Sequence, residues 1–453
     1  MRSCCASWCL VFALTAVGCG RSEPSLPPNL LLVTIDTLRA DHLGAYGYAP
    51  PTSRAFETLA ASGALYTRAQ ATSSWTLPSH ASLFTGLYPF EHGAHSFLGT
   101  QGRNAYPLDT ASPTLAAELR EAGYETAAFV ANVVYMSPWT GLDRGFDRYE
   151  VVRKSGLELN RLIFRWLDAP RERPFFLFVN YMDAHRPYNV APVARLPSLA
   201  DSDPALLDRL VEQVLGSDTP PSPELVARVI AQYDLGVANA DDALGSLLAA
   251  LEQRGLSENT VVVVTSDHGE YFGEHDLVEH SKDVYQPVLW IPLVIRGVSG
   301  TAPQRVDTTL SLAHLPHLIA QELGPLAVQL TSRFSRAPGT EPVLAESYFA
   351  RAKDLGDPRW GARFQRVRRV IFEWPWKRID SSDHRDELYD LAADPGEEND
   401  LSARHPEVGQ RLDAFLEAQL ARASRRKRDP ASPAPTPEEL EELRALGYVD
   451  DAR

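Results

Sequence analysis

Two continuous apolar runs, about 230 residues apart, constrain the fold of this chain more than any other feature of its sequence. One run spans 30–35 and is followed by Asp36, and the other spans 260–266 and is followed by Asp267. Because neither run alternates apolar with polar residues, both are typical of central parallel strands that are buried on two faces. A third buried strand is expected over 175–179.

Helical patterns lie between these strands. Residues 112–121 begin with Ser-Pro, a capping residue followed by a proline suited to the first helical position. A longer helix is expected over about 223–254, because Gly255 then supplies a stop signal. The alternation of strands and helices predicts an α/β fold with a doubly wound, mostly parallel sheet, whose site lies at the carboxyl ends of the strands.

Three side chains that could bind a metal ion follow the ends of two predicted central strands. Asp36 follows the first run, and Asp267 and His268 follow the second. A single aspartate in such a place is more often a turn or cap residue. Because the carboxyl ends of parallel strands meet at one edge of the sheet, the three together predict a divalent-cation site.

The N-terminus resembles a bacterial lipoprotein signal. One basic residue, Arg2, precedes an apolar run over 8–17, and Ala16-Val17-Gly18-Cys19 resembles a lipobox. We therefore expect residues 1–18 to be removed, Cys19 to be lipidated and residues 19–28 to form a tether. The expected location is the bacterial cell envelope, anchored by lipid and facing the periplasm or the cell surface. An ordinary secretory signal with an incidental Cys19 is the alternative.

Cysteine and charge exclude some classes of function. All four cysteines lie within the first nineteen residues, so the remaining domain has no thiol for a disulfide or a zinc site. The formal net charge is −15, and the one basic cluster, over 425–428, is short. No nucleic-acid partner is therefore expected.

The chain resembles the sulfatase family of the alkaline phosphatase superfamily in five segments. In chain order they are the segment around IDTLRADHLG at 35–44, the segment over 76–93 that ends in T-G-x-x-P-x-x-H-G, NYMDAHRPY at 180–188, TSDHGE at 265–270 with GEH at 273–275, and HSK at 280–282. Five such motifs in the order of the family are a specific signal. The resemblance implies an alkaline-phosphatase-like sheet with a smaller C-terminal α+β subdomain.

The corresponding domain boundaries place a catalytic domain over 29–325, a C-terminal subdomain over 326–430, and a linker with a terminal helix over 431–453. Within the subdomain, 368–376 is expected to form a strand. The pattern of apolar residues over 408–420 predicts an amphipathic helix. Thr436-Pro437-Glu438-Glu439 resembles a capping box for the last helix.

Threonine stands where a sulfatase carries the cysteine of its C-x-P-x-R signature, in the sequence Thr76-Leu77-Pro78-Ser79-His80. A threonine cannot be oxidised to the aldehyde that sulfatases use, so Thr76 either acts directly as a metal-activated nucleophile or does not act at all. His80 occupies the position of the arginine that anchors the nucleophile. A Thr-x-Pro-x-His segment is also similar to that of nucleotide pyrophosphatases and phosphodiesterases, but no ligands for their second zinc ion are evident here.

The resemblance implies one divalent cation, with calcium, magnesium or manganese expected and zinc possible. Its expected ligands are Asp36, Thr37, Thr76, Asp267 and His268. Four further residues are expected in the catalytic site: His80 near the nucleophile, His185 and Lys282 on the non-bridging oxygens of the ester, and His280 as the donor of a proton to the departing alcohol. A structural role in hydrogen bonding is the alternative for each of the last three residues.

These features predict a metal-dependent hydrolase of sulfate or phosphate esters whose substrate is a small molecule or a glycan. The alternatives are a phosphodiesterase or phosphonate-ester hydrolase, a transferase that passes the group from Thr76 to another acceptor, and a non-catalytic surface-binding relative. Water readily cleaves a phosphothreonine, so the chemistry favours phosphoesters, whereas the resemblance favours sulfate esters. The polar, proline-rich stretch over 186–225 is a candidate lid that sets the choice of alcohol.

Overall fold

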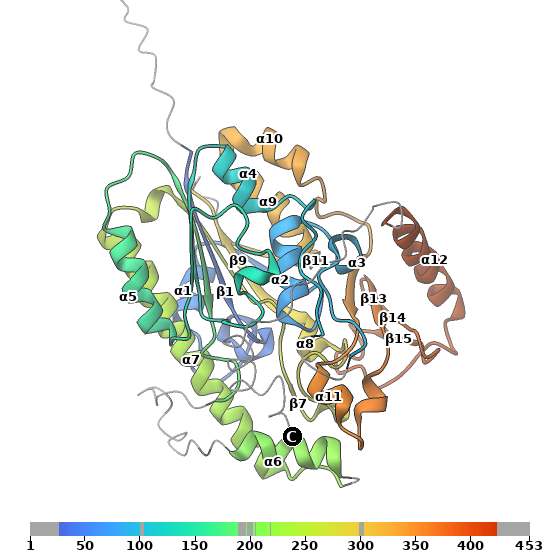
Figure 1. Ribbon diagram of the computed structural model, residues 1–453. Helices are drawn as coiled ribbons and strands as arrows, with labels where there is room; N and C mark the ends of the chain where they lie inside the picture. The colour runs from blue at the N-terminus through green and yellow to red at the C-terminus, as the bar shows by residue number, and fades with distance from the viewer. Residues whose placement is uncertain are drawn as a thin grey trace, which may run out of the picture.

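A large, mostly parallel sheet forms the centre of the protein (Figure 1). The computed structural model describes residues 27–99, 104–188, 196, 203, 205–217, 219–298 and 303–423. In this part of the chain the sheet has nine strands in the order β10-β2-β9-β6-β1-β5-β3-β4, with β11 paired to β2, and β9 runs antiparallel to both neighbours. The strands are β1 Asn29–Ile35, β2 Ala64–Gln70, β3 Glu125–Val130, β4 Arg148–Val151, β5 Phe175–Tyr181, β6 Thr260–Thr265, β9 Trp290–Arg296, β10 Gln304–Val306 and β11 Leu310–Ser311.

The three apolar runs of the sequence lie side by side at the centre of this sheet. β1 pairs in parallel with β5 on one side and with β6 on the other, and every residue of the three strands is buried. Successive side chains point to opposite faces, so Leu31 and Val33 join one core while Leu30 and Leu32 join the other. This two-sided burial explains why the runs show no polar alternation.

Helices cover both faces of the sheet and complete a doubly wound fold, which confirms the predicted fold class. The core that contains Leu31 is closed by α1 Arg54–Ala60, α5 Gly156–Leu167, α6 Ala205–Gly216 and α7 Pro223–Gln253. The core that contains Leu30 is closed by α2 Thr76–Thr85, α4 Leu115–Glu121, α8 Gln286–Leu289, α9 Leu315–Glu322 and α10 Ala327–Arg333. Figure 1 shows α5 and α7 on one side of the sheet and α2, α4 and α9 on the other.

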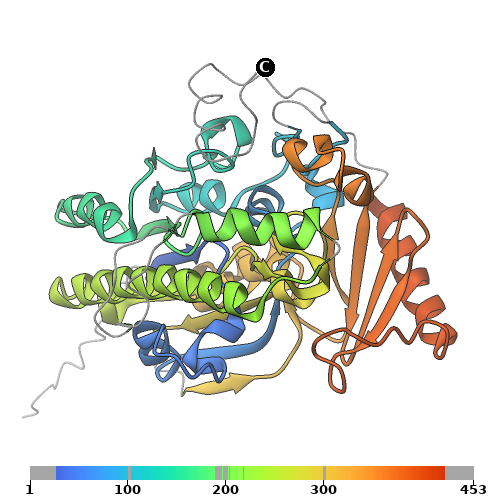
Figure 2. The ribbon, with the colours of Figure 1, turned by 90° about the horizontal axis from the view of Figure 1, so that it is seen from below.

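A second, smaller sheet follows in the C-terminal part of the chain. It is antiparallel, in the order β12 Val343–Ser347, β13 Arg368–Glu373, β14 Trp376–Ser381 and β15 Glu387–Asp390. α12 Pro406–Ala423 packs on the outer face of this sheet through Leu412 and Leu416, as Figure 2 shows in red and orange. α3 Pro89–His92 contributes to the same cluster. The smaller C-terminal α+β subdomain that the resemblance implies is thus present.

Short elements complete the description. They are α11 Ala352–Gly356, β7 Tyr271–Phe272, β8 Val278–Glu279, and the 3-10 turns at Ala40–His42, Gly44–Tyr46, Pro138–Thr140, Ser257–Asn259, Glu274–Asp276, Leu312–His314, Gly324–Leu326 and Gly361–Phe364. No helix among the described residues combines the length and the apolar character that a membrane crossing requires.

Some sequence predictions need correction. The cap of α4 is Thr114 rather than Ser112, because the Thr114 hydroxyl accepts a hydrogen bond of 3.2 Å from the backbone N–H of Ala117. The expected strand over 368–376 ends at Glu373, and a turn then leads into β14, so the segment belongs to a hairpin. The expected signal over 1–18 and the terminal helix with its capping box lie outside the described residues.

Candidate active site

Asp36, Asp267 and His268 meet at the carboxyl edge of the central sheet. Asp36 follows β1 and the other two follow β6, so the pairing of these strands brings together residues that are more than 200 positions apart. One ligand atom from each lies within 4.8 Å of the others, and all three side chains are fully buried. The arrangement follows from the rule that sites in such sheets form outside the carboxyl ends of the strands.

The protonation of His268 suits a metal ligand. Its Nδ1 lies 2.9 Å from the carbonyl oxygen of Gly269, which can only accept, so Nδ1 carries the proton. Nε2 then presents a lone pair to the carboxylates, at 3.4 Å from Asp267 Oδ2 and 3.8 Å from Asp36 Oδ1. Because a lone pair and two carboxylate oxygens repel one another, this geometry favours a cation between them.

Burial of the two aspartates supports the same conclusion. Asp36 Oδ1 and Asp267 Oδ2 are buried without a hydrogen-bond partner among the described residues. Burial raises the pKa of Asp36 to about 8 and the pKa of Asp267 to about 7. A divalent cation would offset this cost of desolvation and complete the coordination of both oxygens, so the residues fit the ion that the family resemblance implies.

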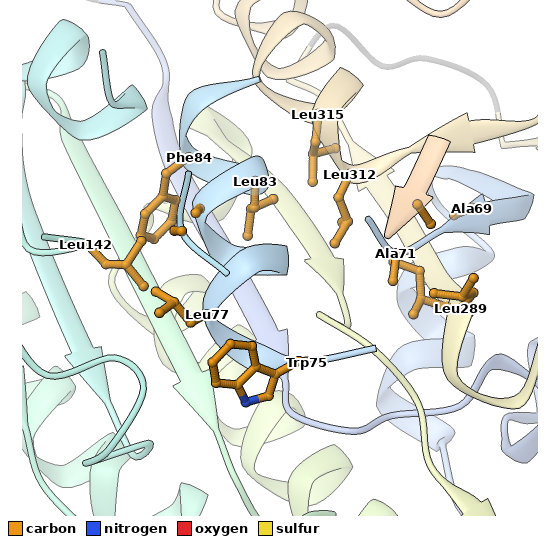
Figure 3. Close-up of a cluster of buried hydrophobic side chains, with 14 of the residues drawn as sticks. Ala69, Ala71, Trp75, Leu77, Leu83, Phe84, Leu142, Leu289, Leu312 and Leu315 are labelled. Atoms are coloured by element: carbon orange, nitrogen blue, oxygen red, sulfur yellow. The ribbon is translucent and has the colours of Figure 1, made fainter. Parts of the chain in front are cut away.

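Thr76 lies beside this triad as the first residue of α2. Its hydroxyl oxygen is 3.4 Å from His268 Nε2, and its side chain is fully buried. Figure 3 shows Leu77, Leu83 and Phe84 of the same helix packed in the core, which holds α2 against the sheet. The N-terminus of α2 therefore faces the site, where its dipole stabilises negative charge on the hydroxyl oxygen.

His80 holds the backbone of Thr76 in place. Its Nδ1 donates to the carbonyl oxygen of Thr76 at 2.9 Å, and its Nε2 lies 3.1 Å from the hydroxyl of Thr34 on β1. Burial lowers the pKa of His80 to about 3, so the ring is neutral. The side chain thus connects the first turn of α2 to the central strand.

Thr37 directs both of its donors toward neighbouring groups. Its hydroxyl donates to the carbonyl oxygens of Asp36 and Ala184, at 2.7 and 3.1 Å, and its backbone N–H donates to Asp267 Oδ1 at 3.3 Å. The residue adopts a φ of 60°, in the left-handed region. Thr37 therefore orients one predicted ligand through its backbone, while its own hydroxyl is hydrogen-bonded elsewhere.

Two of the predicted histidines lie next to the triad. The ring of His280 is 4.6 Å from that of His268 and 5.1 Å from that of His185, measured between centroids. His280 Nδ1 lies 2.8 Å from Glu270 Oε1, and its Nε2 is buried without a hydrogen-bond partner among the described residues. Burial lowers the pKa of His280 well below its usual range and that of His185 to about 3.

Lys282 belongs to a buried network of charges. Its ammonium donates to Glu279 at 2.9 Å and lies 3.6 Å from Asp354. Glu279 also pairs with Arg186 and Arg351. Burial opposes ionisation of Glu279, but the charges of Arg186 and Arg351 hold its pKa well below its usual range. The predicted contact of Lys282 with the ester oxygens stays a prediction, because its ammonium is directed to these carboxylates.

Sequence reasoning missed three residues that contact the site. Asn132 donates to Asp36 Oδ2 at 3.0 Å, Glu270 pairs with His280, and the Tyr188 hydroxyl donates to Glu270 Oε2 at 2.8 Å. Asn132 stands two residues beyond the end of β3, so its position after a buried strand was the signal available. Glu270 and Tyr188 lie in two of the recognised segments, but nothing in those segments indicates that they touch.

Comparisons with known proteins agree with this architecture. A family model named Sulfatase matches residues 28–324. The chain is 27% identical over 346 residues to the uncharacterized sulfatase YidJ of Escherichia coli strain K12, covering 65% of this chain and 67% of that protein. It is 22% identical over 482 residues to an N-acetylgalactosamine-6-O-sulfatase of Bacteroides thetaiotaomicron, covering 87% and 94%. The crystal structure of a phosphonate monoester hydrolase of Agrobacterium radiobacter shares the fold, with a TM-score of 0.68, 22% identity, and coverage of 87% and 96%.

The fold and the site together define an alkaline-phosphatase-like α/β protein with a hydroxyl beside a carboxylate and imidazole triad. The family model matches well over half of the chain. The chain belongs to the sulfatase family. This membership supports a sulfuric or phosphoric ester hydrolase.

Proposed function

We propose that the protein is a metal-dependent hydrolase of sulfate or phosphate esters that uses Thr76 as its nucleophile. The observation that carries this proposal is the position of the Thr76 hydroxyl, 3.4 Å from His268 Nε2 and beside two buried carboxylates. Asp36, Asp267 and His268 would hold one divalent cation. When bound, such an ion lowers the pKa of an adjacent hydroxyl and neutralises charge on ester oxygens.

Side chains of the protein itself would carry out the remaining steps of the reaction. Thr76 attacks the sulfur or phosphorus atom from the N-terminus of α2, where the helix dipole stabilises its developing charge. His80 keeps the Thr76 backbone fixed, and Asn132 orients Asp36. His280, oriented by Glu270, would take the proton of the Thr76 hydroxyl on its Nε2, which has no hydrogen-bond partner among the described residues, and pass that proton to the departing alcohol. Water then releases the group from Thr76 and regenerates the hydroxyl.

The identity of the nucleophile favours phosphorus over sulfur. A sulfatase with an aldehyde-derived nucleophile can expel sulfate by reforming the aldehyde, but a threonine ester has no such route. Water has to attack the central atom, a step that is well established for phosphorylated hydroxyl nucleophiles. We therefore expect phosphate or phosphonate esters to be cleaved faster than matched sulfate esters.

A position in the cell envelope is part of the same proposal. The lipobox at Ala16-Val17-Gly18-Cys19 supports a lipid anchor, which would hold the enzyme at a membrane surface. The similar N-acetylgalactosamine-6-O-sulfatase supports a glycan ester as one class of substrate.

A substrate panel tests the proposal. The purified domain is assayed against matched aryl sulfate, phosphate monoester, phosphodiester and phosphonate monoester, each with Ca²⁺, Mg²⁺, Mn²⁺ or Zn²⁺ after removal of metal by a chelator. We expect turnover of at least one ester that depends on the added cation. Turnover that is equal with and without metal, or the absence of turnover on all four esters, would contradict the proposal.

A further inference from the structure

A pocket with a cavity volume of about 420 Å³ adjoins the active site. His185 lines it, and so do Ala131 and Val133, the two neighbours of Asn132. Asn132 is hydrogen-bonded to Asp36, and His185 lies against His280. A substrate whose ester group reaches the triad therefore has this pocket beside it for its alcohol.

Two cations of the pocket wall are available to a ligand. Arg153 and Lys154 lie on the loop between β4 and α5, and both side chains are exposed. In the described part of the chain, neither side chain forms an ion pair or a hydrogen bond. A third cation of the wall, Arg186, is already paired with Glu279 and lies 3.5 Å from Asp208.

The two carboxylates of the wall are already engaged in capping α5. Both oxygens of Asp183 accept from the backbone N–H of Gly156, at 3.2 and 2.9 Å. Glu158 accepts from the hydroxyl and the backbone N–H of Ser155, at 2.9 and 3.2 Å. The hydrogen bonds from Ser155 are the main cause of the lowered pKa of Glu158, and the positive charge of nearby Lys154 lowers this pKa further. Neither carboxylate therefore forms an ion pair with Arg153 or Lys154 in the described part of the chain.

The charge of the whole protein makes the position of these two cations informative. With a formal net charge of −15, the protein repels anions at long range. Salt screens that repulsion beyond roughly 8 to 10 Å, so cations within the pocket decide whether an anionic group is accepted there. Leu157, 47% exposed, and Met182 supply apolar surface for a ring next to these cations.

We infer that Arg153 and Lys154 bind a second anionic group on the alcohol of the substrate, which is a carboxylate, a sulfate or a phosphate. This inference rests on the proposed function. All three groups offer oxygen acceptors to a guanidinium and an ammonium. The planar fork of Arg153 can bind two oxygens at once, so its contribution exceeds that of Lys154.

Matched phenyl esters test this inference by kinetics. The esters carry a para carboxamide, carboxylate, sulfonate or phosphonate, of which the last two represent sulfate and phosphate without a second cleavable ester bond, and they are compared in wild type, Arg153→Gln and Lys154→Gln. Arg161→Gln is the control, because Arg161 is an exposed cation on α5 that does not line the pocket. We expect Arg153→Gln to raise KM for the acidic esters about fivefold and Lys154→Gln to raise it less, with kcat and the kinetics of the carboxamide ester little changed in both. The rise should shrink at about 0.5 M salt. An equal change for the carboxamide ester, or the same change in Arg161→Gln, would overturn the inference.

Binding of the free alcohols separates this inference from the proposed function. Calorimetric titration compares the four para-substituted phenols and requires no turnover. Tighter binding of an acidic phenol that is lost in Arg153→Gln supports the inference, and the substituent bound most tightly identifies the anion. Equal binding of the acidic and neutral phenols rejects the inference. If the enzyme nevertheless hydrolyses the ester that carries the carboxamide, the proposed function is still supported.

Discussion

The hydroxyl oxygen of Thr76 lies 3.4 Å from Nε2 of His268, although 192 residues separate them in the chain. Thr76 begins α2, and His268 follows β6, so a helix N-terminus and a strand end deliver the two groups to one point. His268 is held by its bond to the Gly269 carbonyl, and Thr76 by the bond from His80 to its own carbonyl. Both groups are therefore positioned before a substrate arrives, as preorganised catalysis requires.

Replacement of Asp267 by Asn should abolish stable metal binding. The change removes one of two buried anionic ligands, and metal affinity should fall by roughly 100-fold or more, together with activity. Elemental analysis and a metal titration measure the effect. Asp234→Asn is the control, because Asp234 is a buried carboxylate paired with His42 at 2.7 Å, outside the triad. Unchanged metal content in Asp267→Asn would show that the cation site lies elsewhere.

Replacement of His80 by Ala should lower both stability and turnover. The variant removes one hydrogen bond from the Thr76 carbonyl and one from the Thr34 hydroxyl, which keeps its bond from Asn180, and creates a cavity in the core. We expect a loss of about 2 to 4 kcal/mol in the free energy of unfolding. Denaturant unfolding and steady-state kinetics measure the two effects. His80→Gln retains a donor and should recover part of kcat, whereas full activity of His80→Ala would exclude a positioning role.

Asp183 should make the stability of the protein depend on pH. Burial raises the pKa of Asp183 to about 6, above its ordinary value of 3.8. Folding therefore favours the protonated form of the Asp183 carboxyl. The contribution of this form to the stability of the folded protein is fully present below pH 3.8 and is lost as the pH rises through 6. Between about pH 4 and 7, Asp183→Asn should gain on the order of 3 kcal/mol relative to wild type. Denaturant unfolding of both proteins at the two pH values checks this, and a difference that does not vary with pH would contradict it.

Cys19 should carry the lipid that anchors the protein. In wild-type cells the protein should sediment with membranes, because a lipid attached to Cys19 would insert into the bilayer. Cys19→Ser should remove the lipid and release the chain or leave it uncleaved. Fractionation and mass spectrometry of the mature N-terminus distinguish these forms. A wild-type protein that is soluble and unlipidated would reject the anchor.

The sequence could predict the part of the site that follows strand ends. A buried apolar run comes directly before Asp36, and another comes before Asp267 and His268. The parallel pairing of the two strands then brings the three residues together, independently of the conformation of the loops. The fold class follows from the same runs, because strands without polar alternation need helices on both faces. These inferences depend on local pattern and on one topological rule.

The remaining contacts depend on tertiary packing that no local pattern encodes. Lys282 and Glu279 are close in sequence, but Asp354 and Arg351 reach them from a segment about 70 residues farther along. The bond between Tyr188 and Glu270 joins two recognised segments whose relative position the motifs do not specify. The pairing of these distant side chains therefore could not be predicted from the sequence and is seen only in the folded structure.

Replacement of Thr76 by Ala should remove the nucleophile while preserving the metal site. Thr76 supplies no carboxylate or imidazole ligand, so the Ala variant should bind close to the wild-type amount of cation. Turnover should fall by roughly 10³-fold or more, because a covalent route loses its attacking atom. Steady-state kinetics and elemental analysis of the same preparation measure the two properties.

Replacement by Ser supplies the matched comparison for the same position. Thr76→Ser keeps the hydroxyl and should retain part of the activity, although loss of the buried methyl group leaves the side chain less constrained. Intact mass spectrometry of a rapidly quenched wild-type reaction should find phosphate or sulfate on the peptide that contains Thr76. Hydrazine reagents should find no carbonyl there, because a secondary alcohol cannot yield an aldehyde. Near-wild-type turnover of Thr76→Ala would mean that water attacks the ester directly, and the nucleophilic role of Thr76 would then have to be abandoned.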